Sequence, residues 1–519
     1  MAKRTDTQLS HPAGTCQSGA WEGKRMRSRS SLGFAFAALI GVSVPVIAQS
    51  PSSSQRPPVD QRNGTKSADP ATDSPTVRLI EEWLQEMQTA DDATYTKFIR
   101  EHVTELPGSP EQWLQFRHIA RGTRLYKVRS ATADGAELWL FDPNLDSFVT
   151  ASAKLNADDH NKLAMITLQP TPDVPAGAAP PAKLKGSALI KAFSARAGHY
   201  ADNDDFSGAV LLAKNGHVLF EKAYGLADRE AHKPNRLDTQ FRFGSMGKMF
   251  TMIGIMQLVE GGRIDPSVPI GRYLPNYPNQ DVATKVTVAN LLTHTGGTGD
   301  IFGPDFETHK ASLRDLKDYV DLYGKRPLEF APGTRFSYSN YGFILLGRII
   351  EEVSGLTYDQ YLQRNIFDPV RMNATGNRPE SEQLPRRSAG YMGSGANLKR
   401  TDDTLPFSGT SAGGGYSTVG DFERFVDGLI SHRLLRADTL QKLISGGITA
   451  KDGTFYPYDF SDTVPGTGRF IGHAGGFPGM NGDLLHFLDS GYTIIVLANR
   501  DPPVSDFIAT FTAKRLPAK

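Results

Sequence analysis

The stretch that most constrains the fold runs from Phe243 to Gly262. Residues Met249–Val259 are apolar nearly all round, and Gly261 and Gly262 follow them. A helix without a polar face has to lie inside the protein, and glycine is a common helix stop. We therefore predict a buried helix that begins near Ser245, around which the rest of a large domain is organised.

The beginning of this helix sets a hydroxyl beside an amine. Ser245 and Lys248 are three residues apart, so their side chains share one helical face, one turn apart. A serine in the first turn lies at the positive end of the helix dipole, and a buried lysine can lose its proton and act as a base. Ser245 is therefore a candidate nucleophile. The alternative is a helix-start serine followed by a surface lysine, because the spacing also arises by chance.

Strand signals occur at both ends of the region that starts near Leu184. The expected strands are Gly208–Ala213, His217–Tyr224, Asp483–Phe487 and Tyr492–Asn499, and the expected terminal helices are Ala188–Tyr200 and Val504–Arg515. An Asn-Gly pair separates the first two strands, which is a strong hairpin signal. We predict an antiparallel sheet built from both chain ends and flanked by helices, with a helical lobe between them in sequence and a cleft where the two parts meet.

A smaller unit precedes this domain, at residues 76–170. Helical spacing of apolar residues is followed by four short strands at Leu125–Val128, Ala136–Phe141, Phe148–Leu155 and Lys162–Leu168. This pattern predicts a helix pair with an antiparallel meander, a small α+β N-terminal domain. A Pro/Ala linker at 171–183 separates it from the main domain at 184–519, and residues 49–75 have the composition of a disordered linker. The partner of the N-terminal domain stays unknown.

Residues 1–48 have the layout of a signal region. Basic residues at Lys24–Arg29 precede an apolar run, Leu32–Ala48, which ends in a small residue. An uncleaved anchor is the alternative, but the run is shorter than the roughly 20 residues of a membrane span. Met26 is a possible true start. We expect an exported protein, periplasmic or secreted, with no membrane span after signal removal.

Charge and cysteine content exclude several function classes. Lys and Arg number 57 against 56 for Asp and Glu, and removal of residues 1–48 would leave 51 against 54. The only cysteine, Cys16, lies upstream of the apolar run, so the mature chain would have no disulfide and no thiol chemistry. There is no basic stripe, no metal-binding spacing and no phosphate loop, so we expect no nucleic acid, no metal and no other cofactor.

Two further motifs lie in the main domain. Tyr338–Asn340 reads Tyr-x-Asn and precedes an apolar helix, Phe343–Val353; His473–Gly475 reads His-x-Gly and lies ahead of the strand at Asp483. Together with Ser245–Lys248, in that order, they resemble the three motifs of the serine β-lactamase and penicillin-binding protein superfamily. The nearest patterns are those of class C β-lactamases and family VIII carboxylesterases.

Two more segments of the main domain are similar to sequence marks of that superfamily. They are residues 291–297, which read Leu-Leu-Thr-His-Thr-Gly-Gly, and residues 412–418, which read Ala-Gly-Gly-Gly-Tyr-Ser-Thr. The resemblance covers about 184–519 and does not extend to the N-terminal domain. It implies a β-lactamase-like fold, which combines helices with an antiparallel sheet and is therefore α/β in the broad sense and α+β in the strict one.

The resemblance implies a serine hydrolase that forms an acyl-enzyme on Ser245. Either Lys248 as a neutral amine or Tyr338 as a phenolate would take the serine proton, and the sequence leaves this open. Tyr338 would return a proton to the leaving group, while Asn340 orients Lys248 and the substrate.

By the same resemblance, the third motif helps to form an oxyanion hole. It departs from the family pattern at one position. The backbone N–H groups of Ser245 and Gly476 would bind the oxyanion, and Gly475 would let the strand come close to the acyl group. Most β-lactamases have a lysine where this chain has His473, and an ordinary histidine, with a pKa of about 6.5, is mostly neutral at pH 7. We therefore expect a small ester, amide or peptide substrate in place of a β-lactam. A purely structural histidine is the alternative.

Other functions remain as alternatives. A β-lactamase or D-alanyl-D-alanine peptidase is one, and a binding protein with an inactive fold of this type is another. Two additional motif matches are expected to be structural: Tyr277–Asn279, whose central residue is proline in a Pro-rich loop, and Gly409–Gly413, which matches a nucleophile elbow but lacks the preceding strand. The sequence leaves substrate identity and oligomeric state open.

Overall fold

The computed structural model describes residues 74–104, 110–170, 175, 177–402 and 404–517. The expected signal region, most of the first linker and part of the second lie outside the described residues. None of the helices within these ranges is long and apolar enough to cross a membrane.

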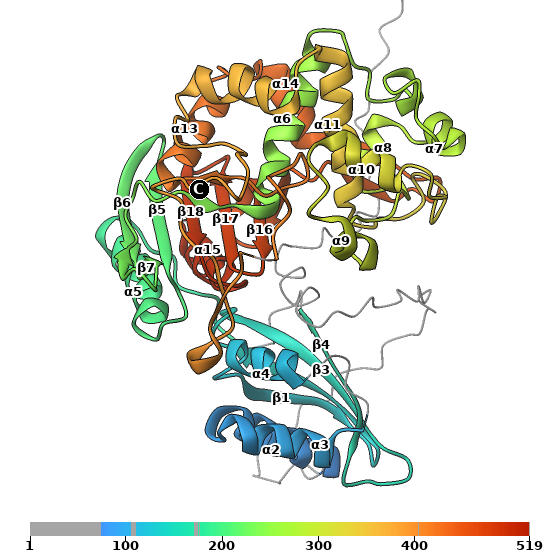
Figure 1. The fold of residues 1–519 in the computed structure, drawn as a ribbon. Coiled ribbons are helices and arrows are strands. Elements are labelled where there is room, and N and C mark those ends of the chain that lie inside the picture. Colours follow the sequence, from blue (N-terminus) through green and yellow to red (C-terminus); the bar gives the residue numbers. More distant parts are fainter. Residues whose placement is uncertain (1–73, 105–109, 171–174, 176, 403, 518–519) are drawn as a thin grey trace, which may run out of the picture.

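The main domain is built on one six-stranded antiparallel sheet in the order β15-β16-β17-β18-β5-β6 (Figure 1). Its strands are β5 (Gly208–Lys214), β6 (His217–Tyr224), β15 (Ser461–Val464), β16 (Gly468–Phe477), β17 (Met480–Phe487) and β18 (Tyr492–Ala498). The N-terminal hairpin pairs with the C-terminal strands through β5 and β18. The prediction of a sheet built from both chain ends is therefore confirmed.

Both faces of this sheet are covered, which explains why β5, β17 and β18 are buried along their whole length or nearly so. Alternate side chains of a strand point to opposite faces. On one face, Val210 and Ile494 pack against α5 (Gly186–Asp202) and α15 (Val504–Arg515). On the other face, Leu211 and Ile495 join the core of the helical lobe.

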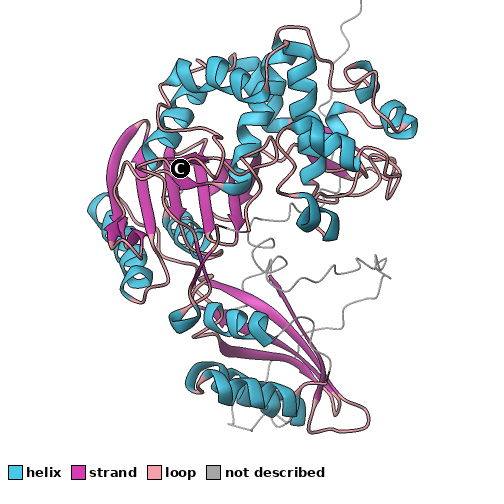
Figure 2. Ribbon diagram, viewed as in Figure 1, coloured by secondary structure: helices cyan, strands magenta, loops and turns pink. Residues whose placement is uncertain are grey.

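The helical lobe lies on one side of the sheet (Figure 2). Its helices are α6 (Lys248–Glu260), α7 (Gln280–Lys285), α8 (Val288–Leu292), α9 (Pro304–His309), α10 (Leu316–Tyr323), α11 (Asn340–Ser354), α12 (Tyr358–Leu362), α13 (Val419–Ile430) and α14 (Ala437–Ser445). Short helical turns are η2 (Gly244–Gly247), η3 (Ile270–Arg272), η4 (Gln363–Phe367), η5 (Asp368–Val370) and η6 (Gly395–Asn397). Short strands are β7 (Leu226–Asp228), β8 (Lys233–Pro234), β9 (Phe241–Arg242), β10 (Tyr391–Met392), β11 (Lys399–Arg400), β12 (Tyr416–Ser417), β13 (Gly447–Thr449) and β14 (Phe455–Pro457).

Helix α6 is buried almost throughout, as its sequence predicts. The ring of Phe250 packs against three aromatic rings from two other segments: its centroid lies 5.0 Å from Phe425 and 5.8 Å from Phe422, both in α13, and 5.1 Å from Phe367 in η4. The helix ends at Glu260, and Gly261, the predicted stop, is its C-cap. Such aromatic packing fixes the helix in the core of the lobe.

The N-terminal unit contains a four-stranded antiparallel sheet and helices. Its strands are β1 (Arg124–Ala131), β2 (Gly135–Asp142), β3 (Ser147–Leu155) and β4 (Leu163–Pro170), and its helices are α2 (Pro75–Thr89), α3 (Asp92–His102) and α4 (Pro110–Ile119). The four strands and the first two helices were predicted, whereas α4 was not. Pro75, assigned to the first linker, is the first residue of α2, a position that suits proline because no N–H bond is lost there.

The turn between β2 and β3 contacts α5 and α15. Lys514 donates to the carbonyls of Leu145 and Asp146, at 2.9 and 2.7 Å, and Arg515 forms an ion pair with Asp146. Leu145 and Val149 also pack against the same core as α15. The N-terminal unit is therefore attached to the face of the main sheet that lies away from the helical lobe.

The fragment 184–519 should fold and keep its activity without the N-terminal unit. The helical-lobe core lies entirely inside it, and what is lost is the contact of Leu145, Val149 and their neighbours with α5 and α15, together with the His118–Asp205 ion pair. We expect a soluble fragment with a reduced Tm, because Lys514 and Arg515 lose their partners. Circular dichroism, thermal unfolding and ester turnover of the fragment and the full chain test this. Insolubility, or loss of turnover, would show that the two units share an essential core.

Candidate active site

Ser245 lies in η2, a tight turn directly ahead of α6. The turn begins with Gly244 at φ 54°, a left-handed conformation that favours glycine. Strand β16 packs directly on this turn: a Cβ added to Gly475 would lie 2.0 Å from the Phe243 carbonyl oxygen and 3.0 Å from the Ser245 nitrogen. Only glycine therefore allows the strand and the turn to meet at this distance.

Lys248 is the first residue of α6, and its side chain is fully buried. Its Nζ lies 3.3 Å from Ser245 Oγ and 2.7 Å from Asn340 Oδ1, and it also contacts the Ala412 carbonyl oxygen. These three partners come from η2, α11 and the loop before β12. The lysine thus connects three segments that are far apart in the sequence.

Burial lowers the pKa of Lys248 from its ordinary 10.5 to about 7. Removal of an ammonium group from water disfavours the charged form. The carboxylates of Asp300 and Asp459 act in the opposite direction and keep the pKa from falling further. A substantial fraction of the amine is therefore neutral near pH 7.

Asn340 is the first residue of α11 and Tyr338 lies two residues ahead of it, so the motif directly precedes the helix as predicted. Ser339 caps this helix through a hydrogen bond from the Gly342 N–H to its Oγ, at 2.9 Å. The phenol of Tyr338 shares a hydrogen bond with Ser245, and burial raises its pKa well above 10. Lys248 Nζ lies 4.8 Å from the centroid of the same ring. Tyr338 is therefore a protonated phenol at neutral pH.

Asp300 is a site residue that the sequence does not reveal. Its carboxylate accepts hydrogen bonds from the backbone N–H of Asn340 at 3.0 Å and from its Nδ2 at 3.2 Å. With the amide nitrogen occupied in this way, the Asn340 side-chain oxygen faces Lys248. Asp300 belongs to the loop before α9 and has no motif of its own.

His473 lies within β16, on the same face as Gly475 and Phe477. Its Nε2 is 3.0 Å from Asp459 Oδ2, and the same oxygen lies 3.1 Å from Nε2 of His294. His294 is fully buried, and its ring stacks on Tyr338 with centroids 4.4 Å apart. His294 belongs to the segment 291–297, whereas Asp459 was not expected from the sequence.

An aromatic pair flanks the same end of β16. The rings of Phe302 and Phe477 are stacked with centroids 5.3 Å apart, and Phe302 is 47% exposed. Phe302 comes from the loop before α9, and Phe477 is two residues beyond Gly475. These rings give the edge of the site an apolar surface.

The two additional motif matches have structural roles. Tyr277 hydrogen bonds to Tyr341 in the core, and Asn279 caps α7. The Oγ of Ser411 is fully buried without a hydrogen-bond partner among the described residues, so it cannot meet a substrate. The contribution of that segment to the site is the Ala412 carbonyl beside Lys248.

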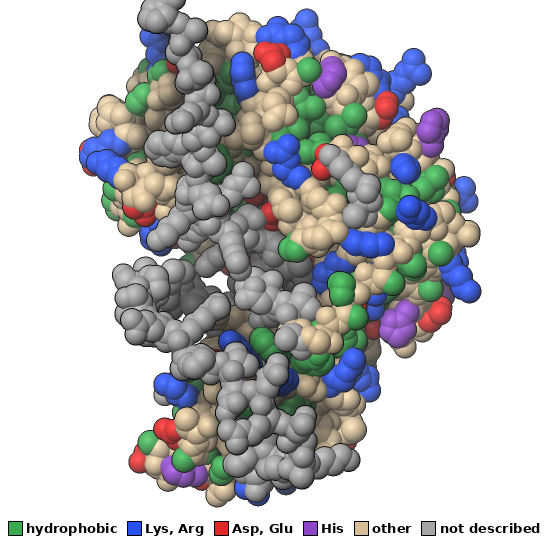
Figure 3. Space-filling view, turned by 180° about the vertical axis from the view of Figure 1, so that it is seen from behind, with side chains coloured by type: hydrophobic (Ala, Val, Ile, Leu, Met, Phe, Trp, Pro, Cys, Tyr) green, Lys and Arg blue, Asp and Glu red, His purple; other side chains and the backbone are tan. Residues whose placement is uncertain are grey.

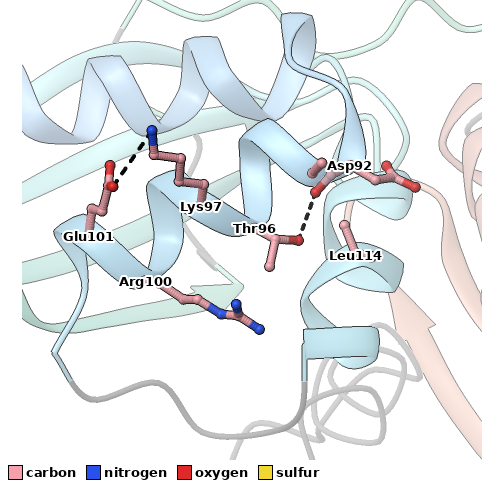
Figure 4. A pocket seen from close by; sticks show the side chains of 7 residues that line it. Asp92, Thr96, Lys97, Arg100, Glu101 and Leu114 are labelled. Atoms are coloured by element: carbon pink, nitrogen blue, oxygen red, sulfur yellow. Dashed lines mark hydrogen bonds and ion pairs between the residues drawn. The ribbon is translucent and has the colours of Figure 1, made fainter.

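A surface hollow of about 530 Å³ lies elsewhere, on the N-terminal unit (Figure 4). It is lined by Asp92, Ala93, Thr96, Lys97, Arg100, Glu101 and Leu114. None of the motif residues contributes to it. On the face drawn in Figure 3, Lys and Arg side chains are spread among acidic and neutral ones.

The main domain, which contains the candidate site, is also the part of the chain that is similar to known proteins. A family model described as Beta-lactamase matches residues 189–519. Penicillin-binding protein 4* of Bacillus subtilis is 28% identical over 320 residues, which cover 58% of this chain and 69% of that protein. Esterase EstB of Burkholderia gladioli is 32% identical over 183 residues, or 33% of this chain and 46% of the esterase. A penicillin binding protein from Bacillus halodurans has a similar structure, with a TM-score of 0.54 and 31% identity, covering 63% of this chain and 99% of that one.

Substitution of Gly475 by alanine should abolish the close contact between β16 and η2. Its Cβ would meet backbone atoms that cannot move aside, so we expect turnover to fall at least about a hundredfold, as on loss of one oxyanion-hole donor. Gly198→Ala in α5 is the matched control, since nothing lies within 4 Å of a Cβ there. It should raise stability by about 0.5 to 1 kcal/mol and leave turnover unchanged. Kinetics and thermal unfolding of both variants measure this, and an active Gly475→Ala would contradict the requirement for glycine.

Proposed function

The chain belongs to the Beta-lactamase family, and on that basis we propose that its main domain hydrolyses an ester or amide of a small substrate by transferring the acyl group to Ser245. In this proposal Lys248 is the base, Tyr338 the acid, and Asn340 the residue that orients the lysine. The backbone N–H groups of Ser245 and Gly476 bind the oxyanion.

The hydrogen bonds of Lys248 carry this assignment. A neutral amine has two N–H groups and one lone pair. Two acceptors, Asn340 Oδ1 and the Ala412 carbonyl, take the two N–H groups. The lone pair then faces Ser245 Oγ at 3.3 Å, where it can accept the hydroxyl proton. Tyr338 is the weaker candidate for the base, since its raised pKa disfavours the phenolate.

Acylation follows from this geometry. Lys248 takes the proton of Ser245 as Oγ attacks the carbonyl carbon, and the tetrahedral oxyanion accepts hydrogen bonds from backbone N–H groups. Tyr338 gives its proton to the leaving group and recovers one from the lysine ammonium. Water then attacks the acyl-enzyme with the same groups acting in reverse, which releases the acid and restores Ser245.

Uncharged or apolar substrates fit the site best. The position that is lysine in most β-lactamases is His473, which is bound to Asp459 and is not a free cation. The exposed ring of Phe302 adds an apolar surface. A β-lactamase or D-alanyl-D-alanine peptidase is the second candidate, favoured by similarity to penicillin-binding protein 4*. A non-catalytic binding protein is disfavoured, because all the motif side chains are present and those of Ser245, Lys248, Tyr338 and Asn340 are in contact.

We also propose that the protein is exported to the periplasm or secreted. The basic and apolar composition of residues 24–48 supports this.

Ser245→Ala should eliminate turnover and covalent labelling by a fluorophosphonate. Mass spectrometry of the labelled wild-type protein should locate the adduct on the peptide that contains Ser245. Ser411→Ala is the matched control and should keep full activity, because the Ser411 hydroxyl is buried and makes no hydrogen bond in the described residues. Labelling at Ser411, or undiminished turnover by Ser245→Ala, would refute the assignment.

A panel of p-nitrophenyl esters, a chromogenic cephalosporin and D-Ala-D-Ala peptides would identify the substrate class.

The pH dependence of acylation should follow Lys248. The base must be neutral, and its pKa is lowered to about 7, so kcat/KM for an uncharged ester should rise with pH through about 7 and then level off. An unperturbed lysine would place this rise near 10.4. Stopped-flow measurement of the acylation burst between pH 5 and 10 tests the prediction. A profile that is flat through neutrality would exclude Lys248 as the base.

A further inference from the structure

One carboxylate joins two histidines beside the proposed nucleophile. Asp459 Oδ2 lies 3.0 Å from His473 Nε2 and 3.1 Å from His294 Nε2. The Asp459 side chain is 34% exposed, the His473 side chain 11%, and the His294 side chain is fully buried. The backbone of Asp459 is held in turn by a hydrogen bond from its N–H to the Leu292 carbonyl, at 3.3 Å.

The hydrogen bonds of the two rings differ. His294 Nδ1 receives the backbone N–H of Ser339 at 3.0 Å, so that nitrogen carries no proton. Its Nε2–H donates to Asp459, which makes His294 a neutral imidazole. Both nitrogens of His473 face acceptors, the Ala474 carbonyl at Nδ1 and Asp459 at Nε2. Both can be satisfied only if each carries a proton.

We propose that Asp459 is a positioning residue that holds His294 neutral and His473 as an imidazolium, and that this charge pairing directs the site towards uncharged esters and amides. The inference rests on the proposed function for its effect on substrates. His473 would then be a cation already bound by Asp459, so it offers little attraction to a substrate carboxylate.

The surrounding groups agree with these proton positions. Burial lowers the pKa of His294, in line with a neutral ring. Burial alone would raise the pKa of Asp459, but the charge of His473 and hydrogen bonds from both histidines hold it well below its ordinary value. The other titratable groups that face this cluster are Lys248 from α6, Asp300 from the loop before α9, and Tyr338 ahead of α11.

The same cluster also positions the proposed acid. The His294 ring stacks on Tyr338 and accepts the N–H of Ser339, the residue that follows Tyr338. Asp459 therefore links the Tyr-x-Asn motif to the His-x-Gly motif through His294 and His473. Its removal should affect both catalysis and substrate charge preference.

Kinetics of Asp459→Asn against pH test the proposal. We expect kcat for a neutral p-nitrophenyl ester to fall roughly tenfold or more, the effect of losing one charge-assisted hydrogen bond. At pH 6 an unpaired protonated His473 should raise the ratio of kcat/KM for a carboxylate-bearing ester to that for the neutral ester by about tenfold, and this gain should disappear above pH 7.5 as the ring loses its proton. Asp459→Glu, which keeps the charge, should restore the wild-type ratio. An equal loss for both substrates at every pH would overturn the proposal.

Nitrogen NMR of the unliganded protein provides a readout that does not depend on turnover. In the full chain labelled with ¹⁵N-histidine, the His473 signals, assigned with His473→Gln, should be those of an imidazolium at pH 7.5 and become those of a neutral ring in Asp459→Asn. Asp205→Asn, which breaks the exposed His118–Asp205 pair, is the matched control and should leave the His473 signals unchanged. A neutral His473 in the wild type would refute the proposal. If Ser245→Ala were fully active, the proposed function would fail, while the NMR result would still decide the histidine states.

Discussion

The burial of the Lys248 amine is the constraint on which the rest of the site depends. A fully buried amine loses its hydration, and the structure replaces that hydration with only two acceptors and one serine hydroxyl. The shift of its pKa to about 7 follows from the same burial. Helix α11, the loop before β12 and the turn before α6 all have to meet at one nitrogen atom.

Close backbone packing imposes the second constraint. Strand β16 contacts η2 so tightly that a side chain at Gly475 would collide with the backbone of Phe243. The strand is held in place by β17, which pairs with β18, and β18 pairs with β5 from the other end of the domain. The hairpin at the beginning of the main domain therefore supports a site whose residues are far downstream.

The predicted fold agrees with the structure where local pattern and packing coincide. The apolar helix after Ser245, the Asn-Gly hairpin and the helix Val504–Arg515 all form where the sequence predicts them, although β6 of the hairpin is a largely exposed edge strand. The Beta-lactamase family model matches residues 189–519, which agrees with the β-lactamase-like fold expected for the main domain. Helix α4 was missed because its apolar residues do not form a clear helical face. The additional motif matches at Gly409–Gly413 and Tyr277–Asn279 proved to be core or capping residues, as expected. Spacing alone cannot distinguish such matches from a catalytic motif.

The sequence by itself determined the order and spacing of the three motifs, the buried helix and the glycines that allow close approach. These are local properties, fixed by helical periodicity and by the absence of a Cβ. Tertiary structure alone decided that Asp300 and Asp459 belong to the site, and that the Ala412 carbonyl, in a segment already marked by the resemblance, contacts Lys248. Each of the three lies more than forty residues from Ser245 in the chain. A single carboxylate or backbone carbonyl has no sequence signature of its own. Their roles arise because a buried charged or polar group requires a partner, and the folded chain decides which group lies next to it.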